Sequence, residues 1–484
     1  MMPQHGKRKG GPGLQTNEDS TPLTIVVVPH THWDREWYNT AEQFRFDLVA
    51  FMDELLDLLE TDERFHSFML DGQVIILEDY LEIRPERKER VVGLVRSGKL
   101  DIGPWYVQPD EFLVSGEALI RNLLRGDRLG RTFGPVMKHG YVPDTFGHTR
   151  QLPQILNGFG IRSAFFMRGL GEDVEELGSE FWWEAPDGSR VLAHYLSESY
   201  SNASVLRPDP DEMALHHGKV VNYDSLWELR GRLARRSRSK VLLLLNGSDH
   251  MTVQSDFTEC VAGLAARLPD RIFNGKLEDF VRLAAESGCP LKTVRGEMRY
   301  GRYQHVLKDT IATRIYLKQR NEQLQQLLEG TVERFAALAF VLCGKDYSAF
   351  VNAAWKELMK NHPHDSICGC SVDPVHREML TRFDRAEQIA GKVLDASLDA
   401  LALQCSAAAE PGAIPIVVFN PSPWKRKDIV RAEVIPHPAP PIGERLVGWG
   451  LEEKAVDLAS YRLLTAEGKE IPFRLIGERL SVED

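Results

Sequence analysis

The chain has 484 residues, of which 43% are hydrophobic and 27% charged, and its formal net charge is −11. This balance is typical of a soluble globular protein with a sizeable core, and the length predicts about two to four domains. The negative charge excludes a nucleic-acid backbone as partner, because binding phosphates requires a concentrated basic surface. A neutral or weakly charged ligand fits better.

Residues 1–21 form a polar, glycine-rich segment that we expect to be a disordered tail. It lacks the apolar core of a signal peptide, and no apolar stretch of the sequence approaches the ~20 residues that would span a bilayer. The six cysteines include no CxxC pair, so no disulfide framework is predicted. We therefore expect a cytoplasmic protein with no membrane partner. The sequence leaves open whether it forms a homo-oligomer.

Residues 22–288 alternate between short aliphatic runs and helical patterns, which predicts βαβ units around a parallel sheet. The candidate strands are TIVVVPH, FHSFML, KLDIG, KHGYVP, SAFFMR, RVLAHYL and KVLLLL. Thr40 and Gln43 predict a capping box at the start of a helix. Five apolar residues follow it at helical spacing, namely Phe44, Leu48, Phe51, Leu55 and Leu59. We predict an α/β domain whose seven or so strands form an open or distorted barrel.

Residues 289–403 differ from the preceding region in composition and in the spacing of their apolar residues. From Thr310 to Leu403 the sequence is rich in Leu, Ala, Arg, Glu and Gln at helical spacing, which predicts a small helical bundle. Residues 404–484 begin with a linker, QCSAAAEPGAIP, and continue with alternating apolar residues that predict strands. These strands are too few to close a sandwich, so we expect a truncated C-terminal β domain.

The first candidate strand leads directly into PHTHWDREWY, residues 29–38. Polar side chains that follow a buried parallel strand lie where α/β folds build their sites. His32 and Asp34 are two residues apart, so in extended backbone they point the same way and could hold a metal such as zinc. A polar loop with satisfied histidines is the simpler interpretation of any single HxD pattern.

The same arrangement recurs twice. KHGYVPDTFGH places Asp144 and Phe146 after a strand, and VLLLLNGSD places Asp249 after another. Three carboxylates at one edge of a sheet favour a metal, a cation or a catalytic role, because an unpaired buried charge costs several kcal/mol. Structural ion pairs are the competing explanation, and Asp249 alone would be equally consistent with a turn or helix-cap residue.

A fourth motif, NHPHDSICG at residues 361–369, interrupts the helical region. His364 and Asp365 could complete the site of His32 and Asp34 across a domain interface, where ligand pockets are common. An exposed His-Asp turn is the alternative. Cys368 and Cys370 could be soft metal ligands, but two thiols at this spacing more often belong to an irregular loop.

HTHWDREW, GYVPDTFGH, NGSD and NHPHDSICG, in this order, resemble the motifs of glycoside hydrolase family 38, the zinc-dependent α-mannosidases. The resemblance extends from about residue 24 to the end of the chain and is most similar to bacterial members, some of which cleave mannosylglycerate. It implies a seven-stranded α/β barrel at residues 22–288, a three-helix segment at 289–403 and the start of a β-sandwich domain at 404–484.

The resemblance also implies roles for individual residues. His32, Asp34, Asp144 and His364 match the ligands of one zinc ion per active site. Asp144 matches the nucleophile as well, and Asp249 matches the acid/base. The residues that it places against the sugar or the nucleophile are Trp37, Phe146, Arg168, Tyr200 and Asp365.

The implied reaction is retaining hydrolysis of a terminal α-mannoside through a covalent mannosyl-Asp144, with the two carboxyl groups ~5–5.5 Å apart. Zinc would hold the cis hydroxyls at C2 and C3 of mannose. Three alternatives remain open: hydrolysis of 2-O-α-mannosylglycerate by the same mechanism, a metal-dependent polysaccharide deacetylase on a similar barrel, and an inactive sugar-binding remnant. For mannosylglycerate, a cation such as Arg35, Arg168, Arg299 or Arg302 would have to meet the glycerate carboxylate.

Overall fold

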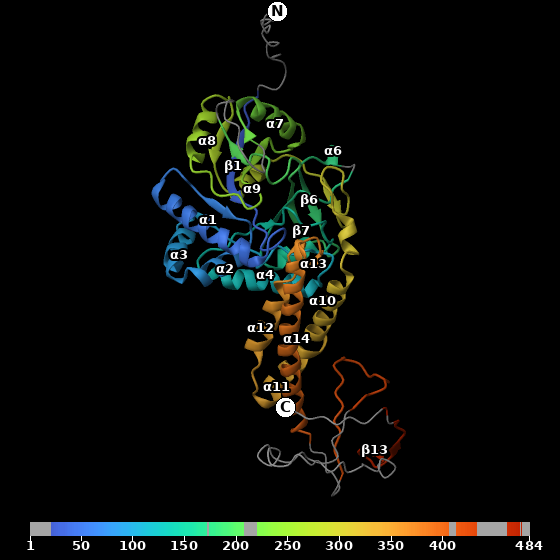
Figure 1. Cartoon of the computed structure of the whole chain (residues 1–484). Coiled ribbons are helices and arrows are strands. Elements are labelled where there is room, and N and C mark those ends of the chain that lie inside the picture. The colour runs from blue at the N-terminus through green and yellow to red at the C-terminus, as the bar shows by residue number, and fades with distance from the viewer. Residues whose placement is uncertain are drawn as a thin grey trace, which may run out of the picture. The chain divides into compact units, whose positions relative to one another are not determined.

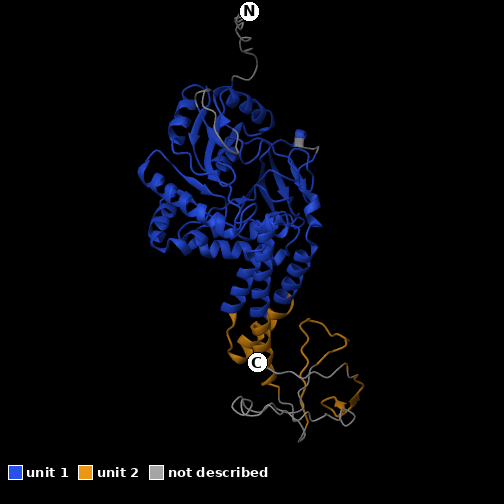
Figure 2. Cartoon of the chain, viewed as in Figure 1, with its two compact units in different colours: residues 1–329, 349–390 blue, residues 330–348, 391–484 orange. Residues whose placement is uncertain are grey.

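The computed structural model describes residues 21–171, 174–207, 220–405, 413–432, 462–474 and 476. The predicted N-terminal tail lies outside these ranges except for Thr21. The chain divides into two compact units (Figure 2): residues 1–329 with 349–390 form unit 1, and residues 330–348 with 391–484 form unit 2. All predicted site residues belong to unit 1.

The first sheet of unit 1 contains β1 (Thr24–Thr31), β2 (Phe68–Leu70), β3 (Leu100–Asp101), β10 (Val241–Asn246) and β11 (Arg271–Asn274). Its order is β10-β1-β2-β3, with β11 also paired to β1, and every pairing is parallel. In β1, Ile25 and Val27 pack into one apolar core and Val26 and Val28 into another, so both faces of the strand are covered.

The second sheet contains β4 (Gly140–Tyr141), β5 (Ser163–Phe166), β6 (Glu180–Glu184), β7 (Arg190–Tyr195) and β12 (Thr293–Arg295). Its order is β12-β6-β7-β5-β4, and only the β6–β7 pair is antiparallel. All seven predicted runs contain a strand. The strands β6, β11 and β12 were not predicted, nor was the short parallel pair β8 (Val205–Leu206) and β9 (Val220–Val221).

The predicted barrel is not confirmed. Within the described ranges, no ladder of paired strands joins the first sheet to the second. The β6–β7 hairpin breaks the parallel order, and β3 and β4 are only two residues long, which gives their edges little to pair with. The two sheets nevertheless share a core, because Val28 and Leu245 of the first pack in one cluster with Tyr141 and Phe165 of the second.

Helices cover the sheets of unit 1 (Figure 1). Helix α1 (Ala41–Thr61) begins with the predicted Thr40–Gln43 capping box, and all five apolar residues predicted for its inner face are buried. The other helices between the strands are α2 (Ile75–Ile83), α3 (Lys88–Arg96), α4 (Gly116–Arg131), α5 (Leu152–Gly158), α6 (Val174–Leu177), α7 (Tyr223–Arg236), α8 (Phe257–Ala265) and α9 (Leu277–Glu286).

The predicted helical region is confirmed. It contains α10 (Ile315–Leu327), α11 (Glu333–Cys343), α12 (Ser348–Met359), the one-turn helix α13 (His364–Ile367) and α14 (Asp373–Ala402). In unit 2, Phe335 and Ala339 of α11 pack with Leu401 of α14. No helix of the described residues is long and apolar enough to cross a membrane.

The predicted C-terminal β domain is not seen as such. Residues 413–432 contain no helix or strand, and the strands described beyond them are the antiparallel pair β13 (Leu463–Leu464) and β14 (Glu470–Ile471). Ile416, Val418 and Ile429 are 43%, 59% and 96% exposed. Within the described residues, the alternating apolar residues of 413–432 therefore form no strand and pack against no sheet. Residues 433–461, which carry part of this prediction, lie outside the described ranges.

Candidate active site

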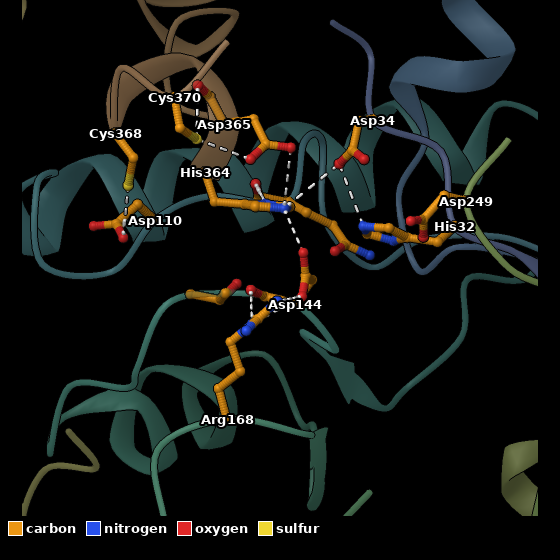
Figure 3. Close-up of polar contacts among 12 residues, drawn as sticks. His32, Asp34, Asp110, Asp144, Arg168, Asp249, His364, Asp365, Cys368 and Cys370 are labelled. Atoms are coloured by element: carbon orange, nitrogen blue, oxygen red, sulfur yellow. Dashed lines mark hydrogen bonds and ion pairs between the residues drawn. The ribbon is translucent and has the colours of Figure 1, made fainter. Parts of the chain in front are cut away.

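Four segments that are far apart in sequence meet in unit 1 (Figure 3). His32 and Asp34 follow β1, Asp144 follows β4, Asp249 follows β10, and His364 opens α13. Because β1 and β10 are parallel neighbours in register, their chains leave the sheet together, and His32 and Asp249 form an isolated parallel bridge just beyond it. The motif NHPHDSICG, which contains His364, therefore lies beside the three motifs that follow strands.

The structure brings together the four residues that were expected to hold a metal. His364 Nε2 lies 3.4 Å from Asp144 Oδ2 and 3.5 Å from Asp34 Oδ1. His32 Nε2 lies 3.3 Å from the same Asp34 oxygen. Both Nε2 atoms are buried and neither makes a hydrogen bond of good geometry. Ligand atoms of His32, Asp144 and His364 all lie within 4.8 Å of one another, as do those of Asp34, His364 and Asp365.

The electrostatics of this cluster favour a bound cation. Burial alone would lower the pKa of His364, but the surrounding carboxylates, Asp365 first, raise the pKa to about 9. Burial, and then the negative charge of Asp34, raises the pKa of Asp365. Three buried carboxylates, those of Asp34, Asp144 and Asp365, lie close to the single nitrogen His364 Nε2. Two imidazole nitrogens without hydrogen bonds and convergent carboxylate oxygens fit a divalent metal ion that accepts both ligand types, such as zinc.

Arg168 holds one carboxylate of the cluster. Its Nε donates to Asp144 Oδ1 at 2.8 Å and to the Asp144 main-chain oxygen at 3.0 Å, and a second guanidinium nitrogen also reaches Oδ1. Burial alone would raise the pKa of Asp144, but Arg168 and the neighbouring His364 keep it below its ordinary value. Phe146 lies beneath the Arg168 guanidinium at 5.4 Å and meets the His364 ring edge-on at 5.3 Å.

Asp249 has a different environment. Its Oδ1 accepts a 2.8 Å hydrogen bond from the Tyr200 hydroxyl, and the Tyr200 main-chain oxygen lies 2.8 Å from Nε2 of the buried His30. Burial raises the pKa of the Asp249 carboxyl. The next residue, His250, is bonded through Nε2 to the main-chain oxygen of Asp34 at 2.9 Å. Asp249 is therefore fixed against the loop that follows β1.

The remaining predicted residues lie around the same cluster. Asp365 accepts a 3.1 Å hydrogen bond from the thiol of Cys370. Trp37 lies in the loop of Asp34, with its ring 5.0 Å from that of Tyr38, and its main-chain oxygen accepts a bond from Val372. Neither Cys368 nor Cys370 belongs to the groups of converging ligand atoms found in the described residues. Both cysteines lie between α13 and α14, and their thiols contact Asp110 and Asp365.

The sequence analysis missed Asp71, the carboxylate that contacts His32. Asp71 Oδ1 lies 3.0 Å from His32 Nδ1, and Asp71 directly follows β2. The sequence did contain a signal for Asp71. FHSFML is followed by Asp71, which is the same pattern of a strand followed by a carboxylate that identified Asp144 and Asp249. The ion pair between Glu36 and Arg382 carried no such signal, because 346 positions separate its members.

Comparisons with known proteins agree with this geometry. Residues 22–278 match the family model "Glycosyl hydrolases family 38 N-terminal domain" and residues 305–401 match "Alpha mannosidase middle domain". A protein of Halalkalibacterium halodurans named "Putative mannosylglycerate hydrolase" is 40% identical over 429 residues, which are 85% of this chain and 46% of that protein. Human "Alpha-mannosidase 2C1" is 24% identical over 414 residues, 84% of this chain and 37% of that protein.

A solved structure is also similar. The crystal structure of an alpha-mannosidase from Enterococcus faecalis V583 superposes with a TM-score of 0.74 at 36% identity, covering 80% of this chain and 43% of that one. The chain spans less than half the length of each of these relatives. The family model alone matches more than half of the chain, and the chain therefore belongs to glycosyl hydrolase family 38.

Proposed function

We propose that this chain carries the active site of a zinc-dependent, retaining α-mannosidase. One observation carries the proposal: His364 Nε2 lies close to both Asp34 and Asp144, His32 Nε2 contacts the same Asp34 oxygen, and both nitrogens lack hydrogen bonds. A further carboxylate with a different environment, Asp249, follows the neighbouring strand. A retaining glycosidase needs two carboxyl groups with different protonation states, one to attack and one to donate a proton. Asp144 and Asp249 meet this requirement.

His32, Asp34, Asp144 and His364 would hold the zinc ion. When bound, it would supply positive charge and open coordination positions for the adjacent cis hydroxyls of a mannose ring. Asp365 faces the same place, since its Oδ2 lies 3.7 Å from His364 Nε2, and it is suited to accept hydrogen bonds from those hydroxyls. A preference for mannose follows from the cis arrangement of the hydroxyls.

Asp144 acts as the nucleophile in the first step. Its carboxylate attacks the anomeric carbon and forms a glycosyl ester while the bond to the aglycone oxygen breaks. The guanidinium of Arg168 keeps the carboxylate ionised, because it holds the pKa of Asp144 below the ordinary value against the effect of burial. The same contacts fix the orientation of the attacking group.

Asp249 provides the proton and later removes one. Burial raises the pKa of this carboxyl, which favours the protonated form needed to donate to the aglycone oxygen. In the second step the Asp249 carboxylate takes a proton from water, which attacks the anomeric carbon and releases Asp144. Two displacements at the same carbon return the original α configuration.

A second substrate is favoured by one observation, the 40% identity to the protein named as a mannosylglycerate hydrolase. Two of the four candidate cations for the glycerate carboxylate, Arg35 and Arg168, are already paired with carboxylates, whereas Arg299 and Arg302 are exposed. Arg35 pairs with Asp79, with the two closest atoms 2.7 Å apart, and only 12% of its side chain is exposed. Arg168 is bonded to Asp144. Arg299, whose side chain is 47% exposed, remains accessible although it pairs with Glu297.

The test is hydrolysis of an aryl α-mannoside and, in parallel, of 2-O-α-mannosylglycerate by the purified protein. We expect chelation to abolish activity and Zn²⁺ to restore it, whereas His32→Ala and Asp144→Ala remain inactive in Zn²⁺. The anomeric configuration of the first product, followed by NMR, should be α. A folded, zinc-loaded protein that hydrolyses neither substrate, or one that releases β-mannose, would contradict the proposal; in the first case a sugar-binding role remains.

A milder effect is expected from Tyr200→Phe. This change removes the hydroxyl that orients the Asp249 carboxyl and keeps the aromatic ring. Asp249 is protonated in the first step, so the lost hydrogen bond joins neutral groups and contributes roughly 0.5–1.5 kcal/mol, and kcat/KM should fall about 2- to 10-fold. Steady-state kinetics on the aryl α-mannoside measure this. Tyr195→Phe, which alters a buried tyrosine of the second sheet, is the matched control and should retain wild-type kinetics; equal values for the two variants would exclude a role for the Tyr200 hydroxyl.

A further inference from the structure

Asp71 is a buried carboxylate for which the proposed mechanism has no step. It follows β2 as three of the four predicted metal ligands follow β1 and β4, and its exposed fraction is 0%. Its backbone φ is +46°, in the left-handed region that residues other than glycine seldom adopt. Such a conformation persists only where the surroundings of the residue impose it. The position of this carboxylate is therefore specified by more than local preference.

One oxygen of the Asp71 carboxylate accepts two hydrogen bonds from fixed donors. Oδ2 accepts from the main-chain N–H of Trp33 and from Gln73 Nε2, both at 2.9 Å. Gln73 Nε2 also donates to the Trp33 carbonyl at 2.9 Å, which fixes the direction of its amide. These two donors occupy one oxygen. The other oxygen, Oδ1, is left facing His32 Nδ1 at 3.0 Å.

The consequence for His32 follows from its two nitrogens. A neutral imidazole carries one proton, and the hydrogen bond made by one nitrogen determines which of them holds it. An ionised carboxylate only accepts, so it requires the proton on Nδ1. The lone pair then resides on Nε2, the nitrogen that points to Asp34 and lacks a hydrogen bond.

We propose that Asp71 is a positioning residue that fixes the tautomer and orientation of His32 for metal binding. This inference rests on the proposed function, because it takes His32 to be a metal ligand. Carboxylates that receive the second N–H of a metal-binding histidine typically contribute 10- to 100-fold to metal affinity. Asp71 provides this contact from β2, a strand that carries none of the four predicted ligands.

Replacement with asparagine distinguishes this role from simple packing. Asn has the same shape, but one of its oxygens becomes an NH₂ group. The Trp33 N–H is a fixed donor, so the amide oxygen should face it, and the NH₂ should face His32. His32 Nδ1 would then have to accept, which moves its proton to Nε2 and removes the lone pair needed by a metal.

The experiment is a measurement of Zn²⁺ affinity by competition with a chromophoric chelator. Asp71→Asn should bind Zn²⁺ about 10- to 100-fold more weakly than the wild-type protein. The matched control is Asp270→Asn, which alters another buried carboxylate with comparable bonds, from the Leu23 N–H at 2.8 Å and from Arg230 at 2.6 and 2.9 Å. This control should lower the unfolding temperature and leave Zn²⁺ affinity unchanged.

Zn²⁺ affinity of a double variant distinguishes a role of Asp71 that acts through His32 from a role in packing. In a His32→Ala background, Asp71→Asn should cause no further loss of Zn²⁺ affinity, because the residue through which it acts is gone. If Asp71→Asn does not fold, Gln73→Leu removes one of the two donors at Oδ2 and should lower the affinity in the same background-dependent way.

The outcomes separate this inference from the proposed function. Wild-type protein that binds Zn²⁺ while folded Asp71→Asn binds it equally well would overturn the role of Asp71 and leave the zinc site intact. An equal loss of affinity in Asp71→Asn and Asp270→Asn would also overturn it. Wild-type protein without affinity for Zn²⁺ would overturn the zinc site first, and the role of Asp71 with it.

Discussion

Asp249→Ala is expected to lower kcat for an α-mannoside with an alkyl leaving group by about 10²- to 10⁴-fold, the usual contribution of a general acid. The carboxyl is placed for this by β10, held by the Tyr200 hydroxyl and made a weaker acid by burial. Asp256→Ala is the matched control, because Asp256 lies in the segment after the same strand but pairs with Arg207. Steady-state kinetics of the control should match the wild type.

The leaving group provides the sharper readout for Asp249→Ala. A dinitrophenyl mannoside needs no proton to depart, so its first step should be nearly unaffected and should produce a burst of dinitrophenol. The second step should then be slow, because water has lost its general base. Azide needs no deprotonation and should restore turnover as α-mannosyl azide. Equal losses for alkyl and dinitrophenyl mannosides, without rescue by azide, would contradict the acid/base role.

Much of the two sheets of unit 1 could be predicted, because the sequence signal of a buried strand is local. Consecutive apolar residues predict the buried strand Val241–Asn246, and apolar residues at helical spacing predict the inner face of helix Ala41–Thr61. The partner of a strand is not a local property. EFWWE forms β6, an antiparallel neighbour of β7, and its three aromatic residues between two glutamates did not stand out beside the longer aliphatic runs.

The candidate site shows the same division. Asp34 and Asp249 could be predicted to lie close together, because they follow β1 and β10, which are parallel neighbours in the first sheet. Asp144 follows β4 of the second sheet, so its place beside them depends on how the two sheets pack and not on one shared edge. His364 lies on a one-turn helix between α12 and α14, so spacing alone could not place it, and the family resemblance was needed to connect it with the rest. Contacts that depend on packing, such as that of Asp71 with His32, became visible only in the structure.

The second large effect concerns Glu36, which lies between the predicted ligand Asp34 and Trp37. Its carboxylate is fully buried and accepts bonds from Arg382 at 2.6 and 2.8 Å and from the Ser366 hydroxyl at 2.7 Å. Ser366 is two residues from His364. Glu36 therefore fastens the loop after β1 to the helix that carries the last predicted ligand, and both ends of this connection lie in unit 1.

Glu36→Ala is expected to lower the free energy of unfolding by about 3–5 kcal/mol, because it leaves the Arg382 guanidinium buried without its partner. Urea denaturation monitored by circular dichroism measures this. The double variant Glu36→Leu/Arg382→Met removes both charges and should recover much of the loss. Glu82→Ala, which removes a 65% exposed carboxylate paired with Arg45, should have a much smaller effect. If Glu36→Ala and the double variant are equally destabilised, the loss comes from packing and not from the unpaired charge.

The Zn²⁺ affinity of the same variants tests whether Glu36 holds the two halves of the proposed metal site together. Glu36→Ala should then bind Zn²⁺ more weakly than the double variant, and Glu82→Ala should bind it like the wild type. Unchanged affinity in folded Glu36→Ala would show that α13 keeps its place without Glu36.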